Sequence, residues 1–510
     1  MSRDEDIELR NIDEEDFYDE LDQNEDIEQF FGLKFARHGK ILSRVPEDFE
    51  GILEIPEGVE ILANNALRSC YGITQIIIPS TFQIFARCAF RNSLINTSFS
   101  VSPDNDFFST SQDGKSLFSE EGSILVKVAT NIEEYIVPEN VKKIGPFAFH
   151  NCKNLKNIVL HNDLSEIAAS AFSGCRSLVD IILPDSIKKI GSWAFLDCIS
   201  LESIHLPKEL NKITTGLLSG CTSLKEIHIP ETVKNISQEA FSNCSVLESI
   251  HIPLETKKID SSAFQGCASL RFITVDENNK KYMAENNVLY DYHQTTLVRC
   301  SVDYEEFDIS EYISTIESYA FSDCENLSKI TLPQYLTAIK EYTFANCPKL
   351  ESIDIPENVT KIGFGAFENC VSLKKITFHQ FSHLKAVGPF AFAECSSLEE
   401  IQLPPTVTTI GTKAENGGCS FSGCESLIEM DIPAKVDFLN EAMFYNCKNL
   451  KKVIIPYNMN YIDQDLFYGC DNLEEVVLRN ANTVIEDGTF DEKVKITIEN
   501  QNINKIYFEI

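Results

Sequence analysis

Hydrophobic and polar residues follow one short pattern that returns along most of the chain. Residues 178–200 show it once, in the order LVDIILPDSIKKIGSWAFLDCIS. Ile181 and Leu183 are two apart and face the same side, as in a half-buried strand. Pro184 ends that strand because it has no backbone N–H. A second short segment and a short helical turn around Phe195 follow. The pattern therefore predicts one coil built from a strand, a short second strand and a short helical turn.

The pattern returns every 23 residues, and two residue types mark its period. Cysteine closes twelve of the units: Cys152, Cys175, Cys198, Cys221, Cys244, Cys267, Cys324, Cys347, Cys370, Cys424, Cys447 and Cys470. Phenylalanine fills a second fixed position: Phe90, Phe149, Phe172, Phe195, Phe241, Phe264, Phe321, Phe344, Phe367, Phe392, Phe421, Phe444 and Phe467. A period of this kind indicates stacked units that share one core. It predicts a β-rich α/β solenoid of about sixteen coils, in which equal positions of successive units become neighbours.

Two segments interrupt the period and resemble each other. Leu117 and Phe118 in the first segment match Leu289 and Tyr290 in the second, and turn residues flank both pairs. This composition predicts two β-hairpin insertions. The predicted division is 1–29 as a disordered acidic tail, 30–98 as the N-terminal cap and first repeats, 99–136 as a hairpin insertion, 137–275 as repeats, 276–308 as the second hairpin insertion, 309–478 as repeats, and 479–510 as the C-terminal cap.

The chain is strongly acidic, with a net charge of −34. Residues 1–29 hold 14 acidic and 2 basic side chains, so they contribute −12 of this charge. An acidic surface repels phosphates, which argues against a nucleic-acid partner. We interpret residues 1–29 as a solvated arm. The alternative is an arm that binds a partner or masks the chain's own surface.

The chain opens without an apolar stretch, so we expect neither a signal peptide nor a membrane anchor. No later segment offers about 20 continuous apolar residues, so no spanning helix is expected. These features predict a cytoplasmic protein. Thiols stay reduced in that compartment. We therefore expect the 17 cysteines to be free and to pack as small buried side chains.

No catalytic or cofactor motif accompanies the repeats. The chain has no phosphate-binding glycine loop, no nucleophile elbow and no zinc-type Cys-x-x-Cys pair. The regular cysteines are a weak metal signal, because their spacing equals the structural period. The sequence therefore predicts a protein that is not an enzyme and has no metal or cofactor.

The residue between two inward-facing strand residues points outward. This position holds His205, His228 and His251 in three successive units. Stacked on the exposed strand face, they favour either a solvated polar strip or a pH-sensitive binding patch, since imidazole changes charge near neutral pH. A transition-metal site is the third interpretation, although parallel strands do not converge three imidazoles on one point.

Lysines recur on the second short segment of the coils. They are expected to point outward at Lys142, Lys143, Lys188, Lys189, Lys212, Lys234, Lys257 and Lys258. Such a basic stripe can serve solubility and discourage edge pairing between strands. The alternative is an electrostatic dock for an acidic partner or for the chain's own acidic tail.

The string L-x-x-I-x-[LI]-P, followed by V-x-x-I-G and A-F-x-x-C-x-x-L, resembles the BspA-like leucine-rich repeats, the 23-residue Treponema-type repeats. LESIHLP at residues 201–207 and VTKIG at 359–363 are examples, and the resemblance covers roughly residues 50–490. It implies a leucine-rich-repeat solenoid without a catalytic motif. Known members include surface antigens and adhesins of oral bacteria and anaerobic parasitic protists. The resemblance therefore implies binding of other proteins or cells, and a cell-surface location.

These observations favour a non-catalytic protein-interaction solenoid whose oligomeric state the sequence leaves open. The resemblance favours a surface antigen or adhesion protein. The cysteines and the missing export signal favour an intracellular scaffold. A recognition subunit of an enzyme would need a pocket with perturbed titratable groups. Residues 282–290 in the second insertion could shelter one, but they hold no evident acid–base pair.

Overall fold

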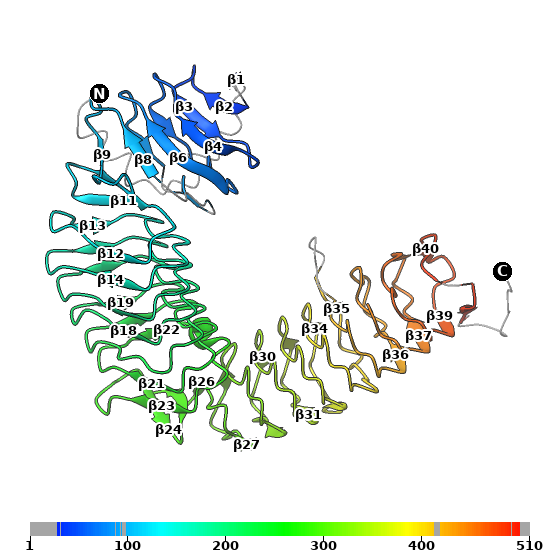
Figure 1. Cartoon of the computed structure of the whole chain (residues 1–510). Helices are drawn as coiled ribbons and strands as arrows, with labels where there is room; N and C mark the ends of the chain where they lie inside the picture. Colours follow the sequence, from blue (N-terminus) through cyan, green and yellow to red (C-terminus); the bar gives the residue numbers. More distant parts are fainter. Residues whose placement is uncertain are drawn as a thin grey trace. The chain divides into compact units, whose positions relative to one another are not determined.

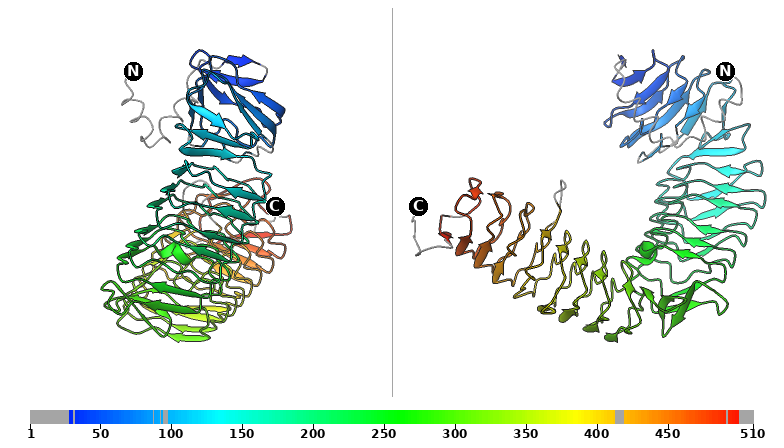
Figure 2. Two further views of the ribbon diagram at one scale, coloured as in Figure 1. Left: turned by 60° about the vertical axis from the view of Figure 1, so that its left-hand side comes forward. Right: turned by 180° about the vertical axis from the view of Figure 1, so that it is seen from behind.

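The computed structural model describes residues 28–30, 32–86, 88–91, 93, 98–412, 419–490 and 492–499. Most of the predicted acidic tail, residues 1–27, therefore lies outside the described residues. The chain divides into two compact units, Met1–Ser245 (unit 1) and Val246–Ile510 (unit 2). Within each unit, strands stack coil upon coil (Figures 1 and 2).

Unit 1 is built from two rows of short strands. The first strands of its coils are β4 (Glu50–Glu54), β6 (Gly72–Ile78), β8 (Ser98–Val101), β12 (Glu134–Ile136), β14 (Asn157–Val159), β16 (Asp180–Ile182) and β18 (Ser203–His205). The second strands are β3 (Ile41–Arg44), β5 (Ile61–Leu62), β7 (Ile84–Phe85), β13 (Lys143–Ile144), β15 (Glu166–Ile167), β17 (Lys189–Ile190), β19 (Lys212–Ile213) and β20 (Asn235–Ile236). Two further strands, β1 (Glu28–Phe30) and β2 (Leu33–Ala36), form an antiparallel sheet with β3.

Unit 2 repeats this arrangement. Its first strands are β21 (Ser249–Ile252), β23 (Phe272–Val275), β27 (Glu306–Asp308), β29 (Lys329–Thr331), β31 (Ser352–Ile355), β33 (Lys375–Phe378), β36 (Glu429–Asp431), β37 (Lys452–Ile455), β39 (Glu475–Leu478) and β41 (Lys495–Ile498). Its second strands are β22 (Lys258–Ile259), β28 (Thr315–Ile316), β30 (Ala338–Ile339), β32 (Lys361–Ile362), β34 (Ala386–Val387), β35 (Thr409–Ile410), β38 (Tyr461–Ile462) and β40 (Val484–Ile485).

The strand register confirms that equal positions of successive coils are neighbours. β12 pairs with β14 in parallel, with Ile136 opposite Val159. β13, β15 and β17 pair in the same way, with Lys143 opposite Glu166 and Glu166 opposite Lys189. The chain makes about 19 turns. The count of about sixteen from the sequence is slightly lower.

Phenylalanine and cysteine line the core as the period predicts. Phe149, Phe172 and Phe195 stack with ring centroids 4.8 and 5.2 Å apart. All 17 cysteines are free thiols, and most are buried. The Sγ of Cys175 donates to the carbonyl of Phe149 in the preceding coil at 3.2 Å, and Cys198 donates to Phe172 at the same distance. Each of these thiols therefore links two coils.

The turn after the second strand is the part of the coil that differs from the prediction, which was a short helical turn. Among the described residues, only η2 (Ser261–Phe264) is a regular helical turn, of the 3₁₀ type. Trp193 and Asp197 adopt φ values of 59° and 56°, which interrupts a right-handed helix. The N–H groups of Trp193, Phe195 and Asp197 instead donate to carbonyl groups one coil further on, at 2.8–3.0 Å. These bonds between coils alternate with hydrogen bonds inside the turn, such as the one from the N–H of Leu196 to the carbonyl of Trp193 at 3.1 Å.

Both predicted hairpin insertions are present. The first contains β9 (Phe108–Thr110), β10 (Ser116–Ser119) and β11 (Ile124–Val128), which pair antiparallel. The second contains β24 (Tyr282–Glu285), β25 (Val288–Asp291) and β26 (Thr296–Arg299), also antiparallel. After each hairpin the last strand pairs in parallel with the second strand of the next coil. The insertions therefore continue the solenoid.

A buried cation stands near the end of each insertion, and the sequence did not predict it. Lys127 Nζ donates to the carbonyls of Phe147 at 3.0 Å and His150 at 3.2 Å. Arg299 Nη1 donates to the carbonyl of Tyr319 at 2.5 Å. Each insertion takes the place of a regular coil next to the coil that follows. The two buried cations donate the hydrogen bonds to the first turn of that following coil. Burial lowers the pKa of Lys127 to about 8.

Candidate functional site

The first strands of each unit point one side chain per coil outward, between two neighbours that are buried or half-buried. We call the surface made by these side chains the strand face. In unit 1 its members include Ile136, Val159, Ile182, His205 and His228. In unit 2 its members include His251, Thr274, Asp308, Thr331, Asp354, Thr377, Gln402, Asp431 and Ile454. The alternation follows from the two-residue period of a strand.

Three consecutive aliphatic side chains on the strand face of unit 1 are exposed. We call Ile136, Val159 and Ile182 the aliphatic ladder. They are 74%, 56% and 72% exposed. Ile136 lies opposite Val159 in the β12–β14 register, and Ile182 follows one coil later on β16, which is adjacent to β14. Exposed Glu134 and Asp180 lie two residues before Ile136 and Ile182. The ladder is thus a continuous apolar strip with a polar margin.

The histidines predicted as a patch all face solvent, but they divide between the two units. His205 lies opposite Ile182 in the β16–β18 register, so it continues the aliphatic ladder. His228 occupies the same position one coil later, and both side chains are exposed. His251 belongs to unit 2 and is half-exposed, with Nδ1 2.9 Å from Thr274 Oγ1. His205 and His228 are therefore the members associated with the ladder.

Carboxylates interrupt the predicted basic stripe. Glu166 lies between Lys143 and Lys189 and pairs with both, at 3.3 and 3.5 Å. Lys142 pairs with Asp163 at 3.3 Å. The other predicted lysines are exposed: Lys188, Lys212, Lys234, Lys257 and Lys258. The pairs leave a mixed-charge surface on β13–β17, since Glu166 stands where the neighbouring repeats have Lys143 and Lys189.

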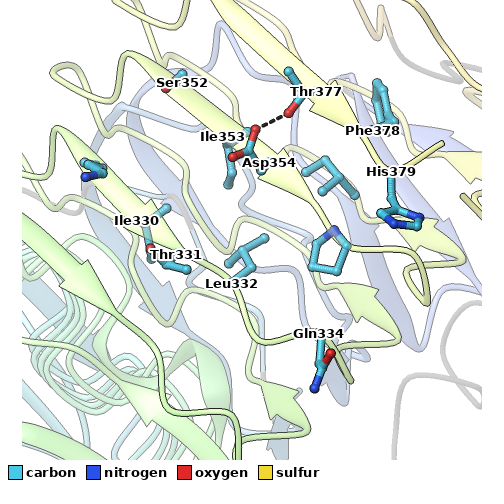
Figure 3. Close-up of a pocket in the computed structure, with 13 residues that line it drawn as sticks. Ile330, Thr331, Leu332, Gln334, Ser352, Ile353, Asp354, Thr377, Phe378 and His379 are labelled. Carbon is cyan, nitrogen blue, oxygen red and sulfur yellow. Dashed lines mark hydrogen bonds between the residues drawn. The ribbon is translucent and has the colours of Figure 1, made fainter.

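Unit 2 carries a hollow on its strand face, with a volume of about 440 Å³. It spans β29, β31 and β33 (Figure 3). Asp354 lies at its centre and accepts a hydrogen bond from Thr377 Oγ1 of the next coil. Leu332 and Ile355 supply buried apolar walls, and Gln334 lies at the edge. The hollow thus combines one carboxylate with apolar surface.

An arginine already occupies the strand face elsewhere in unit 2. Asp431 is the equivalent of Asp354, and it accepts two hydrogen bonds from Arg479, at 3.0 and 3.2 Å. Arg479 Nε also donates to Glu499 at 3.2 Å. Asp431 lies opposite Ile454, which lies opposite Val477 of β39, and Arg479 follows directly after that strand. The guanidinium thus reaches Asp431 on the strand face from two coils further on.

The tyrosines of the second insertion are used in packing. The hydroxyl of Tyr282 accepts a hydrogen bond from the N–H of Ile259 at 2.9 Å. Tyr290 packs against the core of unit 2, and burial raises its pKa to about 12. A phenol that stays protonated at neutral pH is a poor general base. Over the described part of the chain, no cluster of three His, Cys, Asp or Glu side chains is placed to hold a metal.

The sequence held a signal for most strand-face residues that were not predicted. Counting back from Ile182 in steps of 23 residues leads to Val159 and Ile136, and counting back from Thr331 leads to Asp308. Two of them, Val159 and Asp308, are not followed by the proline that ends the strand in the repeat motif. The motif therefore does not identify them. No local signal identifies Arg479, whose partner Asp431 is 48 residues away.

Within the described ranges, no helix has the length and apolar character needed to cross a membrane. No curated protein sequence matches this chain. Among the solved structures to which this chain is similar are three from bacteria. A leucine rich cell surface protein from Faecalibacterium prausnitzii is 20% identical, with a TM-score of 0.41, and the match covers 90% of this chain and 96% of that one. A leucine-rich repeat protein from Eubacterium ventriosum is 22% identical over 71% and 93%, with a TM-score of 0.46. The pneumococcal vaccine antigen PcpA is 19% identical over 93% and 94%, with a TM-score of 0.41.

The repeats themselves match a known family. The family described as "BspA type Leucine rich repeat region (6 copies)" matches residues 51–118, 127–247, 198–291, 293–420 and 417–509. These ranges take in nearly every coil, the second hairpin insertion apart from residue 292, and the first apart from residues 119–126. The chain therefore belongs to the BspA-type leucine-rich repeat family.

Proposed function

We propose that this chain is a non-catalytic protein-interaction solenoid that binds a partner protein through the strand face of unit 1. The observation that carries the proposal is the aliphatic ladder. A continuous exposed apolar strip with a polar margin is typical of an interaction surface. Burying it under a partner would gain roughly 25 cal/mol for each Å² of apolar surface removed from water. His205 and His228 extend the same face and belong to the proposed surface.

Replacing Ile136, Val159 and Ile182 together by serine is expected to weaken partner binding by about tenfold or more, because apolar contacts at the centre of an interface dominate its affinity. The partner is captured with the wild-type chain and purified, and its affinity is measured by isothermal titration calorimetry. A second variant, His205→Ala with His228→Ala, tests whether the histidines contribute and whether binding changes between pH 7.5 and pH 5.5.

The matched control replaces three exposed aliphatic residues of unit 2 by serine: Val371, Ile428 and Val484. This control should bind the partner as the wild type does. Equal affinity of the ladder variant and the wild type would contradict the proposal, as would failure of the wild-type chain to capture any partner.

For the cellular setting, we propose a surface antigen or adhesion-type role that involves binding other proteins or cells, as the family resemblance implies. The alternative is an intracellular scaffold, and the buried free thiols favour it. Burial raises the pKa of Cys152 and Cys198 to about 12, so both stay protonated. Labelling intact cells with a membrane-impermeant amine reagent separates the two. Exposed lysines such as Lys188 and Lys212 will react if the chain is displayed, and an unlabelled chain would exclude the surface role.

A further inference from the structure

We propose that the hollow on the strand face of unit 2 binds an arginine side chain of a partner protein, with Asp354 as the carboxylate that receives the guanidinium. The inference rests on the proposed protein-binding function and names the chemistry of a second contact, in the other unit. It follows from the shape of the hollow, from the unpaired charge of Asp354 and from an arginine of the chain itself, Arg479, that binds the equivalent carboxylate of Asp431.

The hollow suits a side chain that is apolar along its stem and charged at its tip. Its volume of about 440 Å³ falls within the range of about 300–1,000 Å³ found for ligand sites. Leu332 and Ile355 line it with apolar surface, and Figure 3 shows Asp354 with its hydrogen bond from Thr377. Arginine packs its methylene stem on apolar surface while its planar head meets a carboxylate with two hydrogen bonds.

Asp354 is the unpaired charge of the hollow. Its single hydrogen bond among the described residues comes from the neutral hydroxyl of Thr377. The other two ionisable residues that line the hollow each have a carboxylate nearby: Lys329 lies 4.0 Å from Glu306, and His379 lies 3.4 Å from Glu357. Asp354 therefore offers a carboxylate that no cation of the described chain neutralises.

Asp431 shows which side chain a carboxylate at this strand-face position binds. It receives both Nη atoms of Arg479 in a two-pronged contact. Asp354 has the same position in its coil, also between two buried neighbours, and among the residues that the structure describes its hydrogen bond comes from Thr377 and not from an arginine. Lysine would supply only a point charge, whereas the guanidinium matches both carboxylate oxygens. The chain's own contact therefore selects arginine as the occupant.

A second carboxylate, Asp308, determines the spacing that two arginines of a partner segment would need. Asp308 lies on the same face two coils before Asp354, and Thr331 donates to it at 2.6 Å. Two strand spacings of about 4.8 Å place the two carboxylates roughly 10 Å apart. A segment in the polyproline II conformation rises about 3.1 Å per residue and has three residues per turn, so side chains three residues apart point to the same side about 9 Å apart. A partner segment with arginines three residues apart can therefore reach both.

The probe is the labelled, acetylated and amidated peptide Gly-Arg-Ala-Ala-Arg-Gly, and its binding to the full chain is followed by fluorescence anisotropy. Asp354→Asn is expected to weaken binding about tenfold. This substitution keeps an oxygen for Thr377 to donate to, so the local fold should persist, which circular dichroism verifies. A peptide with citrulline in place of both arginines should not bind. Binding should also weaken as salt is raised.

Asp180→Asn is the matched control, since Asp180 is an exposed carboxylate on a first strand of unit 1. It should leave peptide binding unchanged, as should the aliphatic-ladder variant. Equal binding by Asp354→Asn, equal binding of the citrulline peptide, or no binding by the wild type would each overturn the inference. If the ladder variant keeps full affinity for the captured partner while peptide binding depends on Asp354, the proposed surface on unit 1 fails and the arginine site stands.

Discussion

Phe367→Ala lowers the free energy of unfolding of the chain by about 3–5 kcal/mol, the usual loss for a buried phenylalanine. Phe367 is fully buried, and its ring stacks between those of Phe344 and Phe392, with centroids 5.3 and 5.4 Å apart. Each coil of a solenoid contacts chiefly its two neighbours. A cavity at Phe367 therefore weakens both interfaces of its coil, and urea denaturation followed by far-ultraviolet circular dichroism will show an earlier transition.

Phe381→Ala is the matched control, because the same atoms are removed from a side chain that is 65% exposed. Substitutions at such sites usually change stability by less than about 0.5 kcal/mol. A similar loss of stability in both variants would mean that the phenylalanine stack does not hold the coils together. Protection of the neighbouring coils from a protease would distinguish a local opening from complete unfolding.

The stacked core could be predicted from the sequence because it depends only on the period. Once equal positions lie one coil apart, thirteen phenylalanines at one position must lie in a line, and so must the cysteines. The structure adds detail that period alone does not contain: the Sγ of Cys370 donates to the carbonyl of Phe344 at 3.1 Å. The outward position of the strand face follows from the same logic, which is why His205 and His228 face solvent as expected.

The turn after the second strand could not be predicted in the same way. Its residues look helical as a local sequence, but Trp193 and Asp197 take left-handed conformations because their N–H groups bond to the next coil. That choice depends on a neighbour 22 residues away. Arg479 and Asp431 are also far apart in the sequence, by 48 residues, and the stacking of coils brings them together. A local sequence pattern cannot reveal contacts of this kind, because they depend on residues in a neighbouring coil.

Acidification from pH 7 to pH 5 is expected to destabilise unit 1 by about 2 kcal/mol through His150. This side chain is buried, and its Nδ1 has no hydrogen-bond partner among the described residues. Its Nε2 lies 2.9 Å from Asn151 Nδ2, and the Phe147 ring packs at 5.4 Å. Burial lowers the pKa of His150 to about 3, and the positive charge of Lys127 lowers it further. A hydrogen bond with the backbone of Ser173 acts in the opposite direction, and the charges of Arg91 and Lys153 have smaller lowering effects.

The sign follows from proton binding. The unfolded chain takes up a proton on His150 below the ordinary value of about 6.5, whereas the folded chain takes it up only near pH 3. The unfolded state therefore binds more protons across this window, so stability falls as the pH drops through it. Lys127 does not contribute there, because its pKa of about 8 keeps it protonated at pH 5 and at pH 7.

His150→Ser should remove most of this pH dependence, because serine fills the equivalent position in the coils of Ser173, Ser219 and Ser242. Trp193 is the single tryptophan of the chain and lies in unit 1, so its fluorescence reports unfolding of that unit. Denaturant midpoints are compared at pH 7 and pH 5 for the wild type, His150→Ser and the control His205→Ser, whose side chain is exposed. The control should lose stability with acid as the wild type does. If His150→Ser loses as much as both of them, burial of His150 is not the cause of acid sensitivity, and carboxylates that titrate in the same range are the remaining source.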